Sequence, residues 1–163
     1  MAGKRAGNPL AAGAKAPDFK LPGMDGTPHA LSDLLAQGPV LLALYKIGCP
    51  TCQLMLPFLE RIHAARGSLQ IVGISQDNEL GTRRFQSAFQ LTLPMLLDRE
   101  EDGYQVSNAF GIVRVPTLFL IEPDGVISMA AEGFVKTEVE FIGRRAGVQP
   151  FRQDDHVPEW KAG

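Results

Sequence analysis

The sequence predicts an α/β fold in which a central mixed β-sheet is flanked by helices. The first observation is the order of elements: strand, helix, strand and helix are followed by a hairpin and a last helix. The second is the nearly continuous apolar run Val40–Lys46, which suits a central strand buried on both faces. The first two sheet strands are therefore expected to be parallel and joined by a right-handed crossover, while the hairpin adds an antiparallel pair. A chain of 163 residues fits one such domain.

The N-terminal half begins with a short hairpin and then enters the sheet. Residues 18–21 and 27–31 are expected to pair around a turn cluster, as an N-terminal hairpin extension of the domain. A long helix should begin at Pro50, because proline is tolerated in a first helical turn and apolar residues recur at helical spacing after it. Pro57 should kink this helix, and Gly67 should end it.

The C-terminal half alternates strands and helices before it reaches the hairpin. Asp77 or Asn78 can cap a helix that runs to about Gln90. Thr137 and Glu140 have the spacing of a capping box for the last helix. The other expected elements are strands at 69–74, 93–97, 115–121 and 126–131, and short helices near 32–35 and 104–110.

Both ends of the chain are expected to lie outside the domain, which spans 17–147. Residues 1–16 are rich in Gly, Ala and Lys without any period, and they predict a flexible N-terminal arm. Residues 148–163 form a polar C-terminal tail whose one aromatic anchor, Trp160, is expected to dock on the domain surface.

Composition excludes several classes of function. The formal net charge of -2 gives no basic excess, so no nucleic-acid partner is expected. No apolar run approaches the roughly 20 residues of a membrane span. The first residues are basic, but no apolar segment of the signal-peptide type follows them. The sequence therefore predicts a cytoplasmic protein, exported only if a signal peptide has been removed from the chain.

The two cysteines, Cys49 and Cys52, are the most informative residues in the sequence. They fall between a buried strand and a helix, so Cys49 is expected at the helix N-terminus, where unpaired N–H groups and the helix dipole favour a thiolate. Thiols in such motifs have pKa values of roughly 3.5 to 7, against about 8.5 for a free thiol. Cys49 can then attack a disulfide, and Cys52, one turn further in, can resolve the mixed disulfide. The intervening Pro50 and Thr51 are expected to tune the reduction potential.

Two alternatives leave the cysteines without redox chemistry. A Cys-x-x-Cys pair can be half of a structural zinc site, but this needs two further ligands, and the three histidines are scattered through the sequence. The cysteines could also be buried, inert thiols, although their place on a loop before a helix argues against that. The sequence predicts no metal and no cofactor. The histidines are His29, His63 and His156.

The motifs together resemble the thioredoxin-like superfamily, and more closely its TlpA/ResA-like or AhpC/TSA branch. The resemblance spans about residues 14–147 and rests on their combination: Ala16-Pro17-Asp18-Phe19, Cys49-Pro50-Thr51-Cys52 with Pro57, Val115-Pro116-Thr117, and Pro123-Asp124-Gly125. It implies a thioredoxin-like fold and a thiol–disulfide oxidoreductase that acts on protein disulfides and is served by an upstream thiol reductant. It also implies that Pro116 is a cis-proline beside the cysteines, and that Val115, with Pro50 and Thr51, positions the substrate.

The sequence departs from the family pattern at several positions. Peroxiredoxins have a proline seven residues and a threonine three residues before the reactive cysteine, where this chain has Leu42 and Lys46. An AhpC/TSA-type thiol peroxidase acting on hydroperoxides is therefore kept as the alternative function. A non-enzymatic module, such as a metal carrier or a redox-regulated binding protein, is the third hypothesis. The carboxylates that handle the proton of the buried thiol in relatives are replaced by Ala43 and Met55.

Few residues are candidates to replace that carboxylate. Lys46 would favour a thiolate at Cys49 if its ammonium reached the sulfur, although a solvated lysine is the simpler expectation. Glu60 is expected to be an exposed charge on a helix face. Asp77 and Asp98 follow strands, where aspartate usually forms a cap or a turn.

Overall fold

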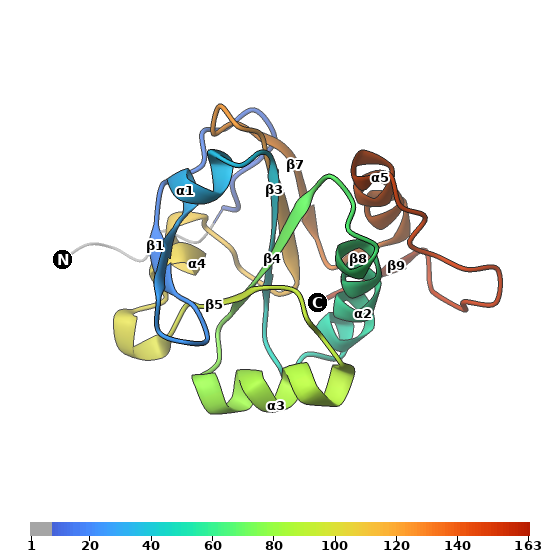
Figure 1. The fold of residues 1–163 in the computed structure, drawn as a ribbon, viewed down its shortest axis with the longest axis horizontal. Helices are drawn as coiled ribbons and strands as arrows, with labels where there is room; N and C mark the ends of the chain where they lie inside the picture. The colour runs from blue at the N-terminus through green and yellow to red at the C-terminus, as the bar shows by residue number, and fades with distance from the viewer. Residues whose placement is uncertain (1–7) are drawn as a thin grey trace.

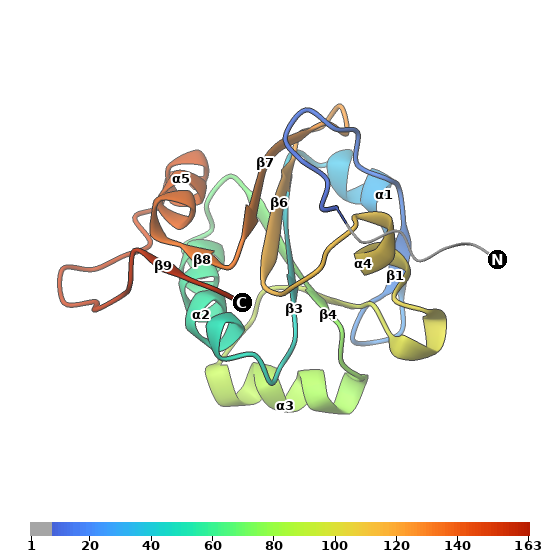
Figure 2. The ribbon, with the colours of Figure 1, turned by 180° about the vertical axis from the view of Figure 1, so that it is seen from behind.

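The computed structural model describes residues 8–163, and its centre is a five-stranded mixed sheet of order β5-β4-β3-β6-β7. Strands β3 and β4 are parallel and the hairpin of β6 and β7 is antiparallel, as the sequence predicts. The structure adds a parallel pair of β4 with β5 and an antiparallel pair of β3 with β6. Figures 1 and 2 show this sheet from its two sides. The strands are β3 (Val40–Tyr45), β4 (Gln70–Ser75), β5 (Met95–Leu97), β6 (Thr117–Ile121) and β7 (Ile127–Glu132).

Helices cover the sheet on both faces and enclose two apolar clusters. The first cluster packs under α2 and α5 and takes in Phe85 of α3, while the second packs under α1 and α4. A single 3-10 turn, Glu100–Asp102, precedes α4. The helices are α1 (Leu31–Leu35), α2 (Pro50–Ala64), α3 (Glu79–Phe89), α4 (Gln105–Ala109) and α5 (Lys136–Ala146).

Strand β3 separates the two clusters. Leu41, Ala43 and Tyr45 belong to the first cluster, while residues between them face the second, and every residue of the strand is fully buried. Burying one large aliphatic side chain contributes about 1.5–3 kcal/mol. The strand is therefore a rigid base for the loop that follows it, residues 46–49.

Both edges of the sheet are met by the N-terminal part of the chain. The hairpin of β1 (Lys20–Pro22) and β2 (Pro28–Ala30) reaches edge strand β5 through a bridge from Gly23 to Leu96. At the other edge, Lys15 bridges to Val126 at the start of β7.

Residues 8–16 are bound to the domain rather than loose, which corrects the expectation for the described part of the arm at 1–16. The Gly13 N–H donates to the Ile127 carbonyl at 2.8 Å, and the Ile127 N–H donates to the Ala14 carbonyl at 2.9 Å. Ala16 is buried in the second cluster. Residues 1–7 lie outside the described residues.

Two local predictions about helix ends are wrong, each because a neighbouring residue takes the position. Helix α5 begins at Lys136 after Val135, without a side-chain cap, so Thr137 and Glu140 form no capping box. Arg66, with φ 55°, rather than Gly67, is the left-handed residue after α2. Gly67 instead allows close approach to the Ala146 carbonyl, which a Cβ would meet at 2.5 Å.

The C-terminal tail returns to the domain as a short strand. Strand β9 (Trp160–Lys161) pairs antiparallel with β8 (Phe134–Val135), and Figure 2 shows it passing close to α2. The Trp160 side chain is 63% exposed, so the backbone and not the indole holds the tail, contrary to the expectation of an aromatic anchor. Among residues 8–163, no helix has the length and apolar character needed to cross a bilayer.

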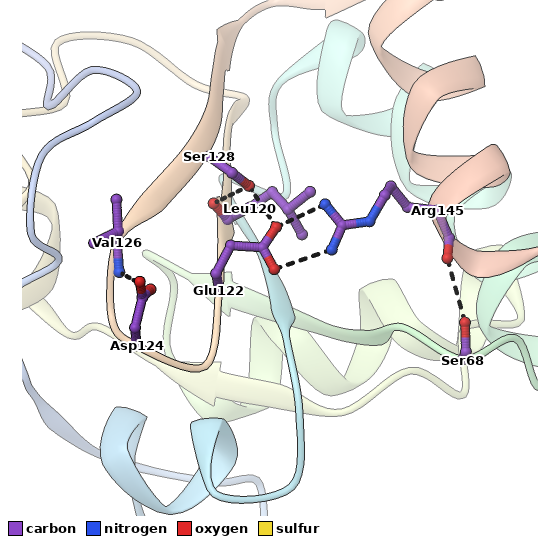
Figure 3. Close-up of polar contacts among 7 residues, drawn as sticks. All are labelled: Ser68, Leu120, Glu122, Asp124, Val126, Ser128 and Arg145. Atoms are coloured by element: carbon purple, nitrogen blue, oxygen red, sulfur yellow. Dashed lines mark hydrogen bonds and ion pairs between the residues drawn. The ribbon is translucent and has the colours of Figure 1, made fainter.

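The end of the sheet farthest from residues 46–49 is held by charged and polar contacts (Figure 3). Glu122, directly after β6, accepts two hydrogen bonds from Arg145 of α5, at 2.6 and 3.0 Å. Ser128 of β7 donates to the same carboxylate at 2.8 Å. These contacts join α5 to the hairpin of β6 and β7.

Candidate active site

Cys49 is the residue that caps the N-terminus of α2. Its backbone is extended, with φ -88° and ψ 116°, and Pro50 occupies the first helical turn, as the sequence predicts. The Cys52 N–H donates to the Cys49 Sγ at 3.2 Å. The Cys49 sulfur therefore accepts one of the N–H groups that the first turn of α2 leaves unpaired.

Cys52 lies one turn into α2 and differs from Cys49 in its access to solvent. Cys52 is fully buried, while Cys49 is half-buried, and both are free thiols. Burial raises the pKa of the Cys52 thiol well above its ordinary value, and a hydrogen bond with Cys49 raises it further. The motif therefore holds one accessible sulfur and one sheltered sulfur that keeps its proton.

The loop before β6 forms the second wall of the site. The Val115–Pro116 peptide bond is cis, as the family resemblance implies. The Cys49 thiol donates to the Val115 carbonyl at 3.6 Å, so the loop and the start of α2 meet at the sulfur. The Thr117 hydroxyl donates to the Arg114 carbonyl at 2.8 Å and ties this loop to the start of β6.

Asp77, a candidate for the missing carboxylate that was expected to form a cap or a turn, supports the loop between β3 and α2. Its carboxylate accepts from the Ile47 N–H at 2.8 Å, and Gln53 donates to the Ile47 carbonyl at 2.9 Å. Asn78, not Asp77, caps α3, through the Gly81 N–H. After burial and the hydrogen bond with Cys49, the negative charge of Asp77 is a further cause of the raised pKa of Cys52.

The position of Asp77 has a signal in the sequence. Strands β3 and β4 are parallel neighbours, so the residues that follow them emerge at the same edge of the sheet. Asp77 follows β4 as Ile47 follows β3. A carboxylate directly after the second parallel strand can therefore reach the loop that carries the first cysteine.

Lys46 lines a small polar pocket together with residues of the loop before β6. The pocket has a volume of about 240 Å³, and its lining includes Lys46, Gln76, Arg114 and Val115. The Lys46 carbonyl accepts from the Cys49 N–H at 3.3 Å, and its side chain is exposed. The influence of its ammonium on the Cys49 sulfur stays a prediction.

Glu60 is not the exposed charge that the sequence predicts. It is 9% exposed, and its carboxylate accepts from the N–H groups of Thr92 and Leu93 and from the Thr92 hydroxyl. These donors offset the cost of burying a carboxylate where α2 packs on the segment before β5. Glu60 therefore fixes that segment.

Asp98, expected to form a cap or a turn, is not the N-cap of α4, which is Tyr104, but its carboxylate binds the first turn of that helix. It is fully buried, and its two oxygens accept from the N–H groups of Val106 and Ser107 and from the Ser107 hydroxyl. Within the part of the chain that the structure describes, no three His, Cys, Asp or Glu side chains are grouped to hold a metal ion.

Thr51, inside the cysteine motif, contacts the C-terminal tail. Its side chain is buried, and its hydroxyl donates to the Ala162 carbonyl at 2.6 Å. Pro50 is exposed beside it. The sequence predicts that Cys49, Cys52, Val115 and Pro116 lie together, and the structure places them at the same end of the sheet strands. The contact of this site with the C-terminal tail was not predicted.

Comparisons with known proteins agree with this geometry. The model of the AhpC/TSA family matches residues 12–130. The thiol-disulfide oxidoreductase ResA of Geobacillus thermodenitrificans is 30% identical over 132 residues, which cover 79% of this chain and 74% of that protein.

Two solved structures are similar over most of the chain. The thioredoxin domain of a thiol-disulfide oxidoreductase from Bacteroides vulgatus has a TM-score of 0.73 at 22% identity, covering 84% of this chain and 99% of that one. The peroxidoxin BcpB from Mycobacterium tuberculosis has a TM-score of 0.66 at 28% identity, covering 75% and 85%. Fold, cysteine motif and relatives lead to one conclusion: the chain belongs to the AhpC/TSA family within the thioredoxin-like superfamily, and it is a thiol–disulfide oxidoreductase.

Proposed function

We propose that this protein reduces or exchanges the disulfides of other proteins, with Cys49 as the nucleophile and Cys52 as the resolving thiol. The observation that carries the proposal is the asymmetry of the pair. Cys49 is half-buried, caps α2 and accepts the Cys52 N–H, while Cys52 is fully buried behind it. An accessible thiolate next to a sheltered thiol is the arrangement that two-step disulfide exchange requires.

The reaction transfers two electrons from the dithiol to the substrate. The Cys49 thiolate attacks one sulfur of the substrate disulfide, whose S–S bond breaks, and the other substrate sulfur leaves as a thiolate and takes a proton. Cys52 then loses its proton and attacks the Cys49 sulfur of the mixed disulfide. The products are a Cys49–Cys52 disulfide and the second substrate thiol, and a thiol reductant must return the pair to the dithiol.

The neighbouring residues have supporting roles in this proposal. Val115 and the cis-Pro116 form the wall against which a substrate segment lies, and Pro50 and Thr51 border the sulfur on the other side. Asp77 holds the loop through Ile47. In a reducing compartment such as the cytoplasm, the resting form is the dithiol, whereas an oxidising compartment requires a dedicated reductant.

Two serine variants test the proposal with insulin as the disulfide substrate. With dithiothreitol as the reductant, Cys49→Ser should lower the catalysed rate by more than about a thousandfold, because it removes the nucleophile. Reduced Cys52→Ser, freed of dithiothreitol before insulin is added, should form a mixed disulfide that persists, detected by mass spectrometry as an adduct on Cys49. Wild-type rates in Cys49→Ser would refute the proposal.

A thiol peroxidase remains the second candidate, favoured by the similarity to the peroxidoxin BcpB. Its chemistry would use the same Cys49 thiolate on a hydroperoxide. Leu42 and Lys46 stand where peroxiredoxins carry the proline and threonine of their reactive motif. Stopped-flow oxidation of the reduced protein by hydrogen peroxide decides the question: a rate no faster than that of a free thiol excludes this candidate.

A further inference from the structure

The end of the tail, residues 159–163, runs past the end of the sheet where the cysteines lie. Trp160 and Lys161 form β9, paired with β8, and the Lys136 N–H donates to the Glu159 carbonyl at 3.0 Å. Figures 1 and 2 both show the chain passing from β9 toward the start of α2. The segment is extended and attached mainly through its backbone.

This segment contacts both walls of the candidate active site. On one side, the Thr51 hydroxyl donates to the Ala162 carbonyl at 2.6 Å. On the other side, Gly163 lies against the Val115 carbonyl so closely that any side chain at Gly163 would collide with it. The Cys49 thiol donates to that same Val115 carbonyl at 3.6 Å, so Gly163 and the Cys49 sulfur contact the same carbonyl group.

The position of residues 159–163 on the domain also depends on Gly133, which lies directly beneath the Lys161 carbonyl. A Cβ at Gly133 would lie 2.6 Å from the Lys161 carbonyl, and Gly133 has a φ of 73°, a conformation that favours glycine. The close backbone approach at Gly133 and at Gly163 indicates a defined binding position for the segment.

The part of the tail before residues 159–163 is fixed to α2 by side-chain contacts, whereas residues 159–163 themselves are exposed. Arg61 of α2 donates to both carboxylate oxygens of Asp155, at 2.6 and 3.2 Å, and to the Pro150 carbonyl at 3.2 Å. Residues 159–163 are all exposed. A short tether keeps the local concentration of a segment high, while few buried contacts make its release inexpensive in free energy.

We propose that residues 159–163 are a built-in competitor for the substrate, occupying the place that an extended segment of a protein disulfide must take to reach Cys49. The proposal rests on the proposed function. An extended peptide binds by pairing its backbone with an exposed edge, and here β9 already pairs with β8 while Gly163 lies against the Val115 carbonyl. Protein disulfides must therefore displace the segment, whereas small disulfides reach the half-buried Cys49 without displacing it.

Two variants at one position test this competition through catalysis. Lys161→Pro removes an N–H and fixes φ, so it should detach β9, while Lys161→Ala keeps the backbone unchanged. Lys161→Pro should raise the rate with insulin by about threefold to tenfold, the effect of removing a tethered competitor, and leave the rate with hydroxyethyl disulfide within about twofold. Lys161→Ala should match the wild type with both substrates. An unchanged or lower insulin rate in Lys161→Pro, or an equal rise with both substrates, would overturn the proposal.

A second measurement needs no turnover and uses the native tail. Trp160 is the sole tryptophan of the sequence, so its fluorescence anisotropy reports on the segment. In Cys52→Ser, a tryptophan-free ten-residue peptide joined to Cys49 by a disulfide should lower the anisotropy, and an S-methyl adduct should not. Unchanged anisotropy in the peptide adduct would overturn the competition. If wild-type protein reduced neither disulfide, the proposed function would fail, and the anisotropy would still decide whether peptide and tail exclude each other.

Discussion

The two ends of the central sheet are built in different ways. At the end shown in Figure 3, the charge of Glu122 is balanced by the two-point contact with Arg145 and by Ser128. At the other end, the Cys49 sulfur has one backbone donor and one backbone acceptor, and no charged side chain is bound to it among residues 8–163. One end is therefore held by charged contacts that stabilise the fold, whereas the reactive sulfur at the other end makes only two backbone contacts.

The sharpest difference should be seen in thiol accessibility at the reactive end. Iodoacetamide is expected to modify Cys49 at least about a hundredfold faster than Cys52 in the native protein, because Cys52 is buried and its raised pKa keeps it protonated. Peptide mapping after timed quenching measures both rates. In guanidinium chloride the two rates should converge. Comparable native rates would remove the asymmetry on which the mechanism depends.

Glu60 lies between the two ends and should affect stability more than activity. Glu60→Ala leaves the N–H groups of Thr92 and Leu93 without their acceptor, at a cost of about 2 kcal/mol in the free energy of unfolding. Urea denaturation measures the change, and the rate with insulin should remain within about twofold of wild type once folded protein is compared. A stability loss below about 0.5 kcal/mol would contradict the role assigned to this carboxylate.

Variants of Asp77 test whether its negative charge raises the pKa of Cys52, in addition to the hydrogen bond that it accepts from Ile47. Asp77→Asn keeps an acceptor for the Ile47 N–H but removes the negative charge, so the pKa of Cys52 should fall. Asp77→Ala should also speed hydrogen exchange at Ile47 by about tenfold, because a charge-assisted hydrogen bond is lost. A titration of the Cys52 13Cβ chemical shift and amide exchange by NMR measure the two effects. An unmoved or raised Cys52 pKa in Asp77→Asn would show that the charge is too well screened to act.

The smallest effect is expected at the opposite end. The Arg145 guanidinium lowers the pKa of Glu122, so the ion pair stabilises the fold above the ordinary glutamate pKa, and this stabilisation is lost as pH falls through the lowered pKa. The pair is partly exposed and should contribute no more than about 1 kcal/mol. Glu122→Gln should therefore lose roughly 0.5 kcal/mol at pH 7 and match the wild type at pH 3, with unchanged activity. A loss that persisted at pH 3 would assign the effect to hydrogen bonding instead.

The sequence predicted the sheet and the cysteine site because both depend on local patterns. The apolar run of β3 and the motif at Cys49 are visible in adjacent residues, and the family resemblance supplied the cis-proline at Pro116. Glu60 was misplaced because helical periodicity does not show which segment packs on its face. The contacts of Ala162 with Thr51 depend on a chain that returns over more than a hundred residues, and no local pattern encodes that path.

The N-terminal segment has a consequence for behaviour in concentrated solution. Edge strands with free N–H and C=O groups are templates on which other molecules stack, and natural sheets are commonly shielded there. Here Gly23 forms a bridge to Leu96 of β5, and Lys15 forms one to Val126 next to β7, so the same N-terminal segment contacts both edge strands of the sheet. We expect loss of that stretch to expose β5 and β7 and so to favour edge-to-edge association of the sheets of different molecules.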